Sequence, residues 1–303
     1  MPPILEWYIF SNDTPIQANH RQTDRNMTGR VFFLLTCWLL ITCGIANAGG
    51  SLTLWIHPYL PATELTERFA PLVEYLEREL EQPVEVHIQR SYQTHVDMVG
   101  RDLADIAYVG PSSYIQITRQ YGRKPLLVKI EVNGAPYFRG IIAVREEAPY
   151  TTLADLAGKS FAFGDFNSTM SHIVPRIMLM QSGIPTTKLA HHDFLGSHHD
   201  VALAVLGGYF EAGAVKQEVF ETYRSRGLRM LATTPPIPNH LFLTRSNLPP
   251  ELIIRIRNAL LALNVSPEKN KILTMMEDSA TGLLPVSDQD YDEFRQLVTD
   301  QQP

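Results

Sequence analysis

The alternation of apolar and polar positions after residue 50 predicts strands and helices in turn. Residues 51–56 alternate as a first strand does, and apolar residues then recur every three or four positions over 65–80, which predicts a helix with one buried face. Thr63 stands where a helix cap would, and Pro71 predicts a kink or a break inside this helix. The chain therefore opens as a strand followed by a long helix.

The same alternation continues to the end of the chain. Further strands are expected at 84–88, 105–109, 140–144, 161–163, 190–194, 213–215 and 228–232, and further helices at 91–101, 153–158, 171–180, 200–206, 250–263 and 288–298. Strands that alternate with helices are typical of α/β proteins with parallel sheets. The pattern restarts near 138–145 and returns through a Pro-rich stretch at 233–240, so we expect two lobes, 49–137 plus 240–303 and 138–239, with a hinged cleft between them.

The N-terminal segment has the pattern of an export signal. Residues 31–42 form an apolar run, Arg30 precedes it, and an A-x-A cleavage site ends at Ala48. The run is shorter than the roughly 20 residues that a membrane span needs. We therefore expect residues 1–48 to be a signal peptide, with translation starting at Met27, and a tilted membrane anchor is the alternative.

Composition and cysteine content narrow the chemistry. The chain has 303 residues, of which 45% are hydrophobic and 19% charged, as in ordinary folded proteins, and its net charge of −6 argues against broad nucleic-acid binding. Cys37 and Cys43 both precede the expected cleavage site, so the mature chain would hold no disulfide and no thiol nucleophile. A lipid-modified Cys43 is a second interpretation, which fits less well because Thr42 precedes it.

Two motifs suit an anion. Residues 167–171 read Asn-Ser-Thr-Met-Ser between a predicted strand and a predicted helix. The first turn of a helix has free N–H groups and partial positive charge, and hydroxyl groups add donors. Simple helix capping by Asn167 or Ser168 explains the same motif. His198, in the Gly-Ser-His-His-Asp stretch 196–200, precedes the next predicted helix and could donate a further hydrogen bond.

These motifs and several others, in the same order, resemble the phosphate/phosphonate-binding periplasmic proteins that serve ATP-driven importers. The matching stretches are 105–111, 155–159, 163–175, 196–206, 207–215 and 235–238, within a resemblance that spans 51 to about 298. The resemblance implies a two-lobed periplasmic-binding-protein fold (type II-like) with two mixed or parallel sheets. It implies a periplasmic, non-enzymatic protein without a cofactor that captures a phosphonate, phosphite or phosphate, with the membrane permease and ATPase of an ABC importer as partners.

The resemblance also assigns the ligand contacts. They fall on Tyr92, Phe138, Ser168, Thr169, Met170, His198, Glu218 and His240. Ser168, Thr169 and the backbone at Met170 would hold the oxyanion, and His198 would add a donor. Tyr92 would close over the ligand from the first lobe, and a second aromatic residue would come from Phe138, with Tyr137 one position away.

Two positions depart from the family pattern. Family members that bind aminoalkyl phosphonates hold the ammonium group with two acids; Glu218 matches one of them, and the other falls on His240. The loss of one carboxylate weakens ammonium recognition, which disfavours 2-aminoethylphosphonate as the ligand. Met170 replaces a hydroxyl residue. Phosphite, phosphate, methylphosphonate and a different small anion remain open.

Three other functions are open. A zinc-binding protein would use the His and Asp residues of 191–193 and 198–200, although adjacent side chains on an extended segment point to opposite faces. An enzyme could pair Ser168 with His198, but the sequence has no G-x-S-x-G, H-E-x-x-H or phosphate-loop motif. A sensor would pass ligand-dependent closure to a separate signalling protein.

Overall fold

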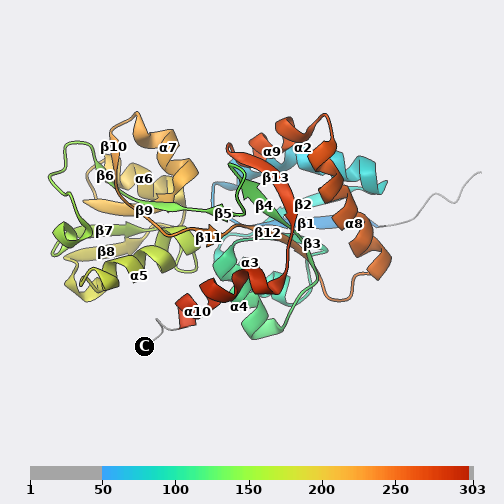
Figure 1. Ribbon diagram of the computed structural model, residues 1–303, viewed down its shortest axis with the longest axis horizontal. Coiled ribbons are helices and arrows are strands. Elements are labelled where there is room, and N and C mark those ends of the chain that lie inside the picture. The colour runs from blue at the N-terminus through green and yellow to red at the C-terminus, as the bar shows by residue number, and fades with distance from the viewer. Residues whose placement is uncertain (1–49, 300–303) are drawn as a thin grey trace, which may run out of the picture. The chain divides into compact units, whose positions relative to one another are not determined.

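The computed structural model describes residues 50–299, which form two β-sheets flanked by helices (Figure 1). One sheet has six strands in the order β13-β4-β12-β3-β1-β2, and the other has five in the order β10-β6-β9-β7-β8. This arrangement confirms the predicted α/β class with two sheets. The predicted signal peptide, 1–48, with Cys37 and Cys43, lies outside the described residues.

The six-stranded sheet takes strands from both ends of the described chain. They are β1 Leu52–Ile56, β2 Val84–Ile88, β3 Ile106–Val109, β4 Leu126–Val132, β12 Leu241–Thr244 and β13 Ala280–Pro285. β1 pairs in parallel with β2 and β3, whereas β12 and β13 pair antiparallel with their neighbours, so the sheet is mixed. The same parts of the chain form helices α2 Ala62–Leu80, α3 Tyr92–Gly100, α4 Pro111–Tyr121, α8 Pro250–Ala262, α9 Lys269–Met276 and α10 Asp292–Thr299.

The five-stranded sheet is built from the middle of the chain. Its strands are β6 Gly140–Arg145, β7 Ser160–Phe163, β8 His191–Phe194, β9 Ala212–Lys216 and β10 Leu228–Thr233, and its helices are α5 Val174–Gln181, α6 His198–Leu206 and α7 Gln217–Arg224. β7 is parallel to β8 and β9, and β6 is antiparallel to β9 and β10. Two short strands, β5 Tyr137–Phe138 and β11 Ile237–Pro238, pair where the chain passes between the sheets. That the predicted lobes move as separate bodies stays a prediction.

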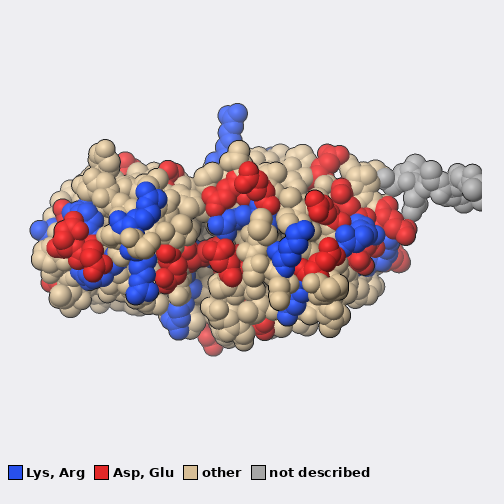
Figure 2. Space-filling view, turned by 90° about the horizontal axis from the view of Figure 1, so that it is seen from above, with Lys and Arg blue, Asp and Glu red and all other residues tan. Residues whose placement is uncertain are grey.

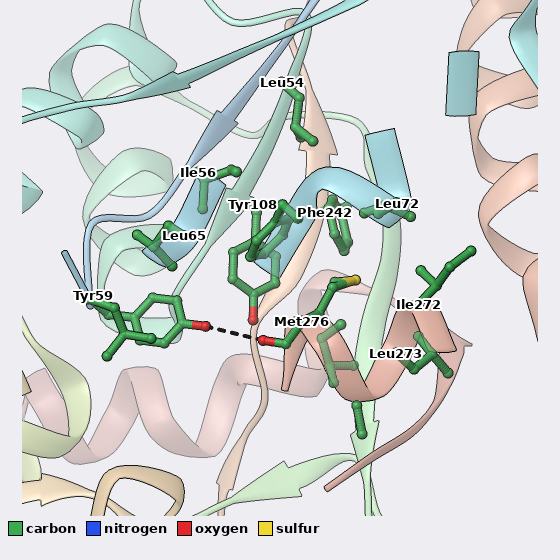
Figure 3. Close-up of a cluster of buried hydrophobic side chains, with 14 of the residues drawn as sticks. Leu54, Ile56, Tyr59, Leu65, Leu72, Tyr108, Phe242, Ile272, Leu273 and Met276 are labelled. Carbon is green, nitrogen blue, oxygen red and sulfur yellow. Dashed lines mark hydrogen bonds between the residues drawn. The ribbon is translucent and has the colours of Figure 1, made fainter. Parts of the chain in front are cut away.

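Helix α2 shows how the apolar pattern builds the core. Its buried positions are Leu65, Phe69, Leu72, Tyr75, Leu76 and Leu80, which form one face at helical spacing. Figure 3 shows part of this face beside Tyr108 and Phe242 of neighbouring strands and Met276 of α9. The helix runs through Pro71 without a break, so the predicted split is wrong. The buried face on both sides of Pro71 offsets the lost hydrogen bond, which costs about 3 kcal/mol in a helix interior.

Gly213 lets α6 lie close to β9. A Cβ atom at this position would stand 2.6 Å from Cγ1 of Val201 and 3.2 Å from the carbonyl oxygen of Ala162. We expect Gly213→Ala to lower the free energy of unfolding by about 1–3 kcal/mol, because overpacking a dense core strains it. Urea denaturation measures the change. Gly50→Ala, where a Cβ meets nothing within 4 Å, is the control and should change little; equal stability of both variants would contradict the packing account.

Candidate functional site

Three adjacent parallel strands of the five-stranded sheet end in polar residues at one edge. Ser168 follows β7, His198 follows β8 as the first residue of α6, and Lys216 is the last residue of β9. Carboxyl ends of parallel strands are the usual binding edge of an open α/β sheet. Ser168 Oγ lies 3.4 Å from His198 Nε2, and the backbone N–H of Lys216 donates to His198 Nδ1 over 2.9 Å.

The six-stranded sheet contributes residues at the corresponding places. His57 and Tyr59 follow β1, Tyr92 follows β2, and His240 directly precedes the antiparallel strand β12. Together the two sets enclose a cavity of about 10 Å³, close to the least space that a water molecule needs. Its lining is His57, Tyr59, Tyr92, Phe138, Ser168, Thr169, Met170, His198, Lys216 and His240. Seven of the eight predicted contacts therefore lie around one cavity, and Glu218 does not line it.

Ser168 both caps a helix and faces this cavity. Its Oγ accepts the backbone N–H of Ser171 over 3.1 Å, at the start of a π-helical turn, Thr169–Ile173, that leads into α5. Tyr92 lines the same cavity, and burial raises the pKa of its phenol. Since Ser171 N–H already supplies a hydrogen to Oγ, the Ser168 hydroxyl hydrogen is left to donate. The two interpretations of this motif, capping and anion binding, are therefore compatible.

The hydrogen bonds of His198 fix its tautomer. Nδ1 accepts the Lys216 N–H, so we assign the ring hydrogen to Nε2. Burial, with the nearby Lys216 charge adding to it, lowers the pKa of His198 to about 3, so the ring is neutral. A neutral ring with a hydrogen on Nε2 can donate to an anion but cannot accept the proton of Ser168. This geometry argues against a nucleophile–base pair.

The Thr169 hydroxyl bonds to Ser112, which belongs to α4 beside the six-stranded sheet. Ser112 N–H donates to Thr169 Oγ1 over 3.1 Å, and the two hydroxyl oxygens are 2.8 Å apart. The Ser112 hydroxyl donates to the carbonyl of Asn167 over 2.5 Å, so the Thr169 hydroxyl must donate to Ser112. Thr169 thus faces the cavity with its hydroxyl hydrogen already used.

Three lining residues, His57, Tyr59 and Lys216, were not singled out from the sequence. His57 packs edge-on against Tyr92 with ring centroids 4.0 Å apart, and its buried Nδ1 has no hydrogen-bond partner among the described residues. His240 stacks on Tyr108 at 5.2 Å. Burial lowers the pKa of both imidazoles well below the ordinary value. The sequence signal that could have identified them is their position at or just after the carboxyl end of a strand.

Lys216 is a buried ammonium held by two carboxylates. Its Nζ lies 2.9 Å from Glu277 and 3.3 Å from Glu218, and Arg68 pairs with Glu218 over 2.5 Å. Burial alone would raise the pKa of Glu218, but the Lys216 and Arg68 charges hold it below the ordinary value. Burial raises the pKa of Glu277, against the pull of Lys216. Glu218, which the resemblance matched to an acid that holds a ligand ammonium group, is therefore already paired with two cations of the protein.

The histidine-rich stretches do not converge. His191 stacks on Phe210 at 5.6 Å, whereas His192 lies edge-on to Phe163 at 6.0 Å. Within residues 50–299, no group of three or more His, Cys, Asp or Glu side chains is placed to hold a metal ion. In the same part of the chain, no helix is long and apolar enough to cross a membrane.

Sequence and structure comparisons place the chain among known proteins. It is 26% identical over 273 residues, or 82% of this chain and 84% of the relative, to the phosphate-import protein PhnD of Mycolicibacterium smegmatis. The structure of Prochlorococcus marinus PhnD1 with methylphosphonate superposes with a TM-score of 0.76 at 20% identity, covering 82% of this chain and 97% of that one. A binding-protein component of a phosphonate ABC transporter from Pseudomonas aeruginosa gives a TM-score of 0.74 at 18% identity, covering 82% and 88%.

These structures share the two-lobed binding-protein fold, which confirms the predicted fold class. The model of one family, described as ABC transporter, phosphonate, periplasmic substrate-binding protein, matches residues 54–291. The predicted resemblance is therefore confirmed, and the family is one of substrate-binding transport proteins. The chain belongs to the periplasmic phosphonate substrate-binding proteins of ABC transporters.

Proposed function

We propose that the protein captures a small phosphorus oxyanion, such as phosphite, phosphate or methylphosphonate, in the cavity around Ser168. The donors supporting this are the Ser168 hydroxyl, the Nε2–H of His198 and the phenol of Tyr92, because all three residues line the same cavity. The helix start behind Ser168 adds positive potential through its backbone dipoles. The phosphate-import relative and the methylphosphonate-bound neighbour are consistent with this ligand class.

Closure of the cleft would complete the site. The bonds from Ser112 to Thr169 and Asn167 join residues that follow β3 and β7, one strand from each sheet. When such contacts form around a ligand, they exclude water, and hydrogen bonds to the anion strengthen as the local dielectric falls. Thr169 acts in this proposal as a closure contact through its hydroxyl, while Ser168, His198 and Tyr92 hold the oxygens.

The closed protein would then deliver its ligand to a membrane permease driven by an ATPase. Family membership supports these partners. We propose a periplasmic location on the same ground, with residues 1–48 as the export signal. On the face shown in Figure 2, acidic and basic side chains are interspersed, which is compatible with a small anion being recognised in a cavity rather than on a charged surface.

Removal of two hydroxyl groups tests the assigned site. The variant Ser168→Ala/Thr169→Ala should lose about 2–4 kcal/mol of binding free energy, since it lacks one direct charge-assisted bond and one closure contact. Calorimetric titration with phosphite, phosphate and methylphosphonate measures the loss. Ser225→Ala, an exposed serine at the end of α7, is the control. Unchanged affinity in the double variant would place the binding site elsewhere.

A further inference from the structure

Lys216 and Phe138 stand between two cavities. Both residues line the 10 Å³ cavity around Ser168, and both also line a second cavity of about 550 Å³. The larger cavity is bordered by four acidic residues, Glu218, Glu221, Glu277 and Asp278, and by two cations, Arg139 and Lys216. Any substituent on a phosphorus atom held by Ser168 that extended toward this acidic space would meet the Lys216 side chain.

The Lys216 ammonium fills a complete cation site. Two carboxylates lie within 3.3 Å of Nζ, as described above, and the rings of Tyr59 and Phe138 face it at 5.0 and 5.9 Å. Carboxylates and aromatic faces are the groups that proteins use to bind ammonium ligands. Lys216 is 2% exposed, so this arrangement is buried beside the oxyanion cavity and not a surface ion pair.

We propose that Lys216 acts as a built-in ammonium that occupies this cation site and restricts the protein to phosphorus oxyanions without a cationic substituent. This inference rests on the proposed function of the Ser168 cavity. A ligand such as 2-aminoethylphosphonate would bring a second ammonium toward carboxylates that are already paired, against the like charge of Lys216. Phosphite, phosphate and methylphosphonate carry no such group.

The first test compares two ligands of equal length. n-Propylphosphonate has a methyl group where 2-aminoethylphosphonate has an ammonium group. Calorimetry on the wild-type protein should find 2-aminoethylphosphonate bound at least about tenfold more weakly than n-propylphosphonate, since one unmatched charge forfeits at least one charge-assisted bond. Equal or tighter binding of 2-aminoethylphosphonate would overturn the inference. Failure of phosphite, phosphate and methylphosphonate alike to bind would instead overturn the proposed function.

The second test removes the lysine. Lys216→Ala joins the two cavities and leaves Glu277 unpaired, so affinity for 2-aminoethylphosphonate should rise at least about tenfold more than affinity for n-propylphosphonate. Lys216→Met/Glu277→Gln, which removes one charge of each sign, is the matched control and should show no such selective gain. An equal change for both ligands in Lys216→Ala would overturn the inference. If this variant does not fold, the comparison of the two ligands on the wild-type protein tests the inference alone.

Discussion

The protein should lose most of its stability as the pH falls from 6.5 to about 4. Five imidazoles are buried among residues 50–299: His57, His95, His172, His198 and His240. Burial lowers the pKa of His95 and His172 to about 4 and that of His198 to about 3, and lowers the other two well below 6.5. An unfolded chain therefore binds more protons than the folded one throughout this window, and the linkage relation makes folding weaken as protons are added.

The expected loss of stability on acidification is large. Each such imidazole contributes about 1.4 kcal/mol for every pH unit between its folded pKa and 6.5, against a total stability of about 5–15 kcal/mol for typical proteins. Two carboxyls, Asp165 and Glu277, act in the opposite direction because burial raises their pKa. Urea denaturation at pH 7, 6 and 5 measures the effect. His172→Gln should reduce the slope of the free energy of unfolding against pH by the equivalent of one bound proton. Equal stability of the wild-type protein at pH 7 and pH 5 would contradict this expectation.

Lys216→Met should lower the free energy of unfolding by about 3–5 kcal/mol, the usual cost of removing one partner of a buried ion pair. The substitution keeps the volume of the side chain but leaves Glu277 without its cation, whereas Glu218 retains Arg68. Urea denaturation at pH 7 measures the loss. Lys216→Met/Glu277→Gln should regain much of it, because no buried charge is then left unpaired. A double variant no more stable than Lys216→Met would show that packing, not charge, sets the cost.

Most of the fold was predictable because its signals are local. The strands at 84–88 and 228–232 and the helix at 250–263 follow from apolar periodicity and turn residues, and the structure confirms each within one residue. Elements that were not predicted, such as β12 and β13, join the first sheet only through pairing with distant β3 and β4. Pairing between segments more than 100 residues apart leaves no local pattern, so the composition of the six-stranded sheet needed the structure.

Residues of the candidate site that belong to a sequence motif could be found from the sequence, whereas those that only the fold brings together could not. Ser168 and His198 belong to recognisable stretches and do meet at 3.4 Å. The Thr169 hydroxyl bonds to Ser112 because α4 lies opposite Thr169 in the fold. The apolar periodicity of the sequence does not reveal this arrangement. Lys216 was not predicted because a lysine two residues from a glutamate ordinarily belongs to a solvated surface pair. Only its burial between two cavities shows that it matters for the site.

A crystal structure of the protein with methylphosphonate would locate the proposed binding site. We expect the phosphonate in the cavity around Ser168, with oxygens at about 2.7–3.2 Å from Ser168 Oγ and His198 Nε2 and the methyl group toward Lys216 and Phe138. A phosphonate bound in another cavity, or with its oxygens on Lys216 and away from Ser168 and His198, would contradict this proposal.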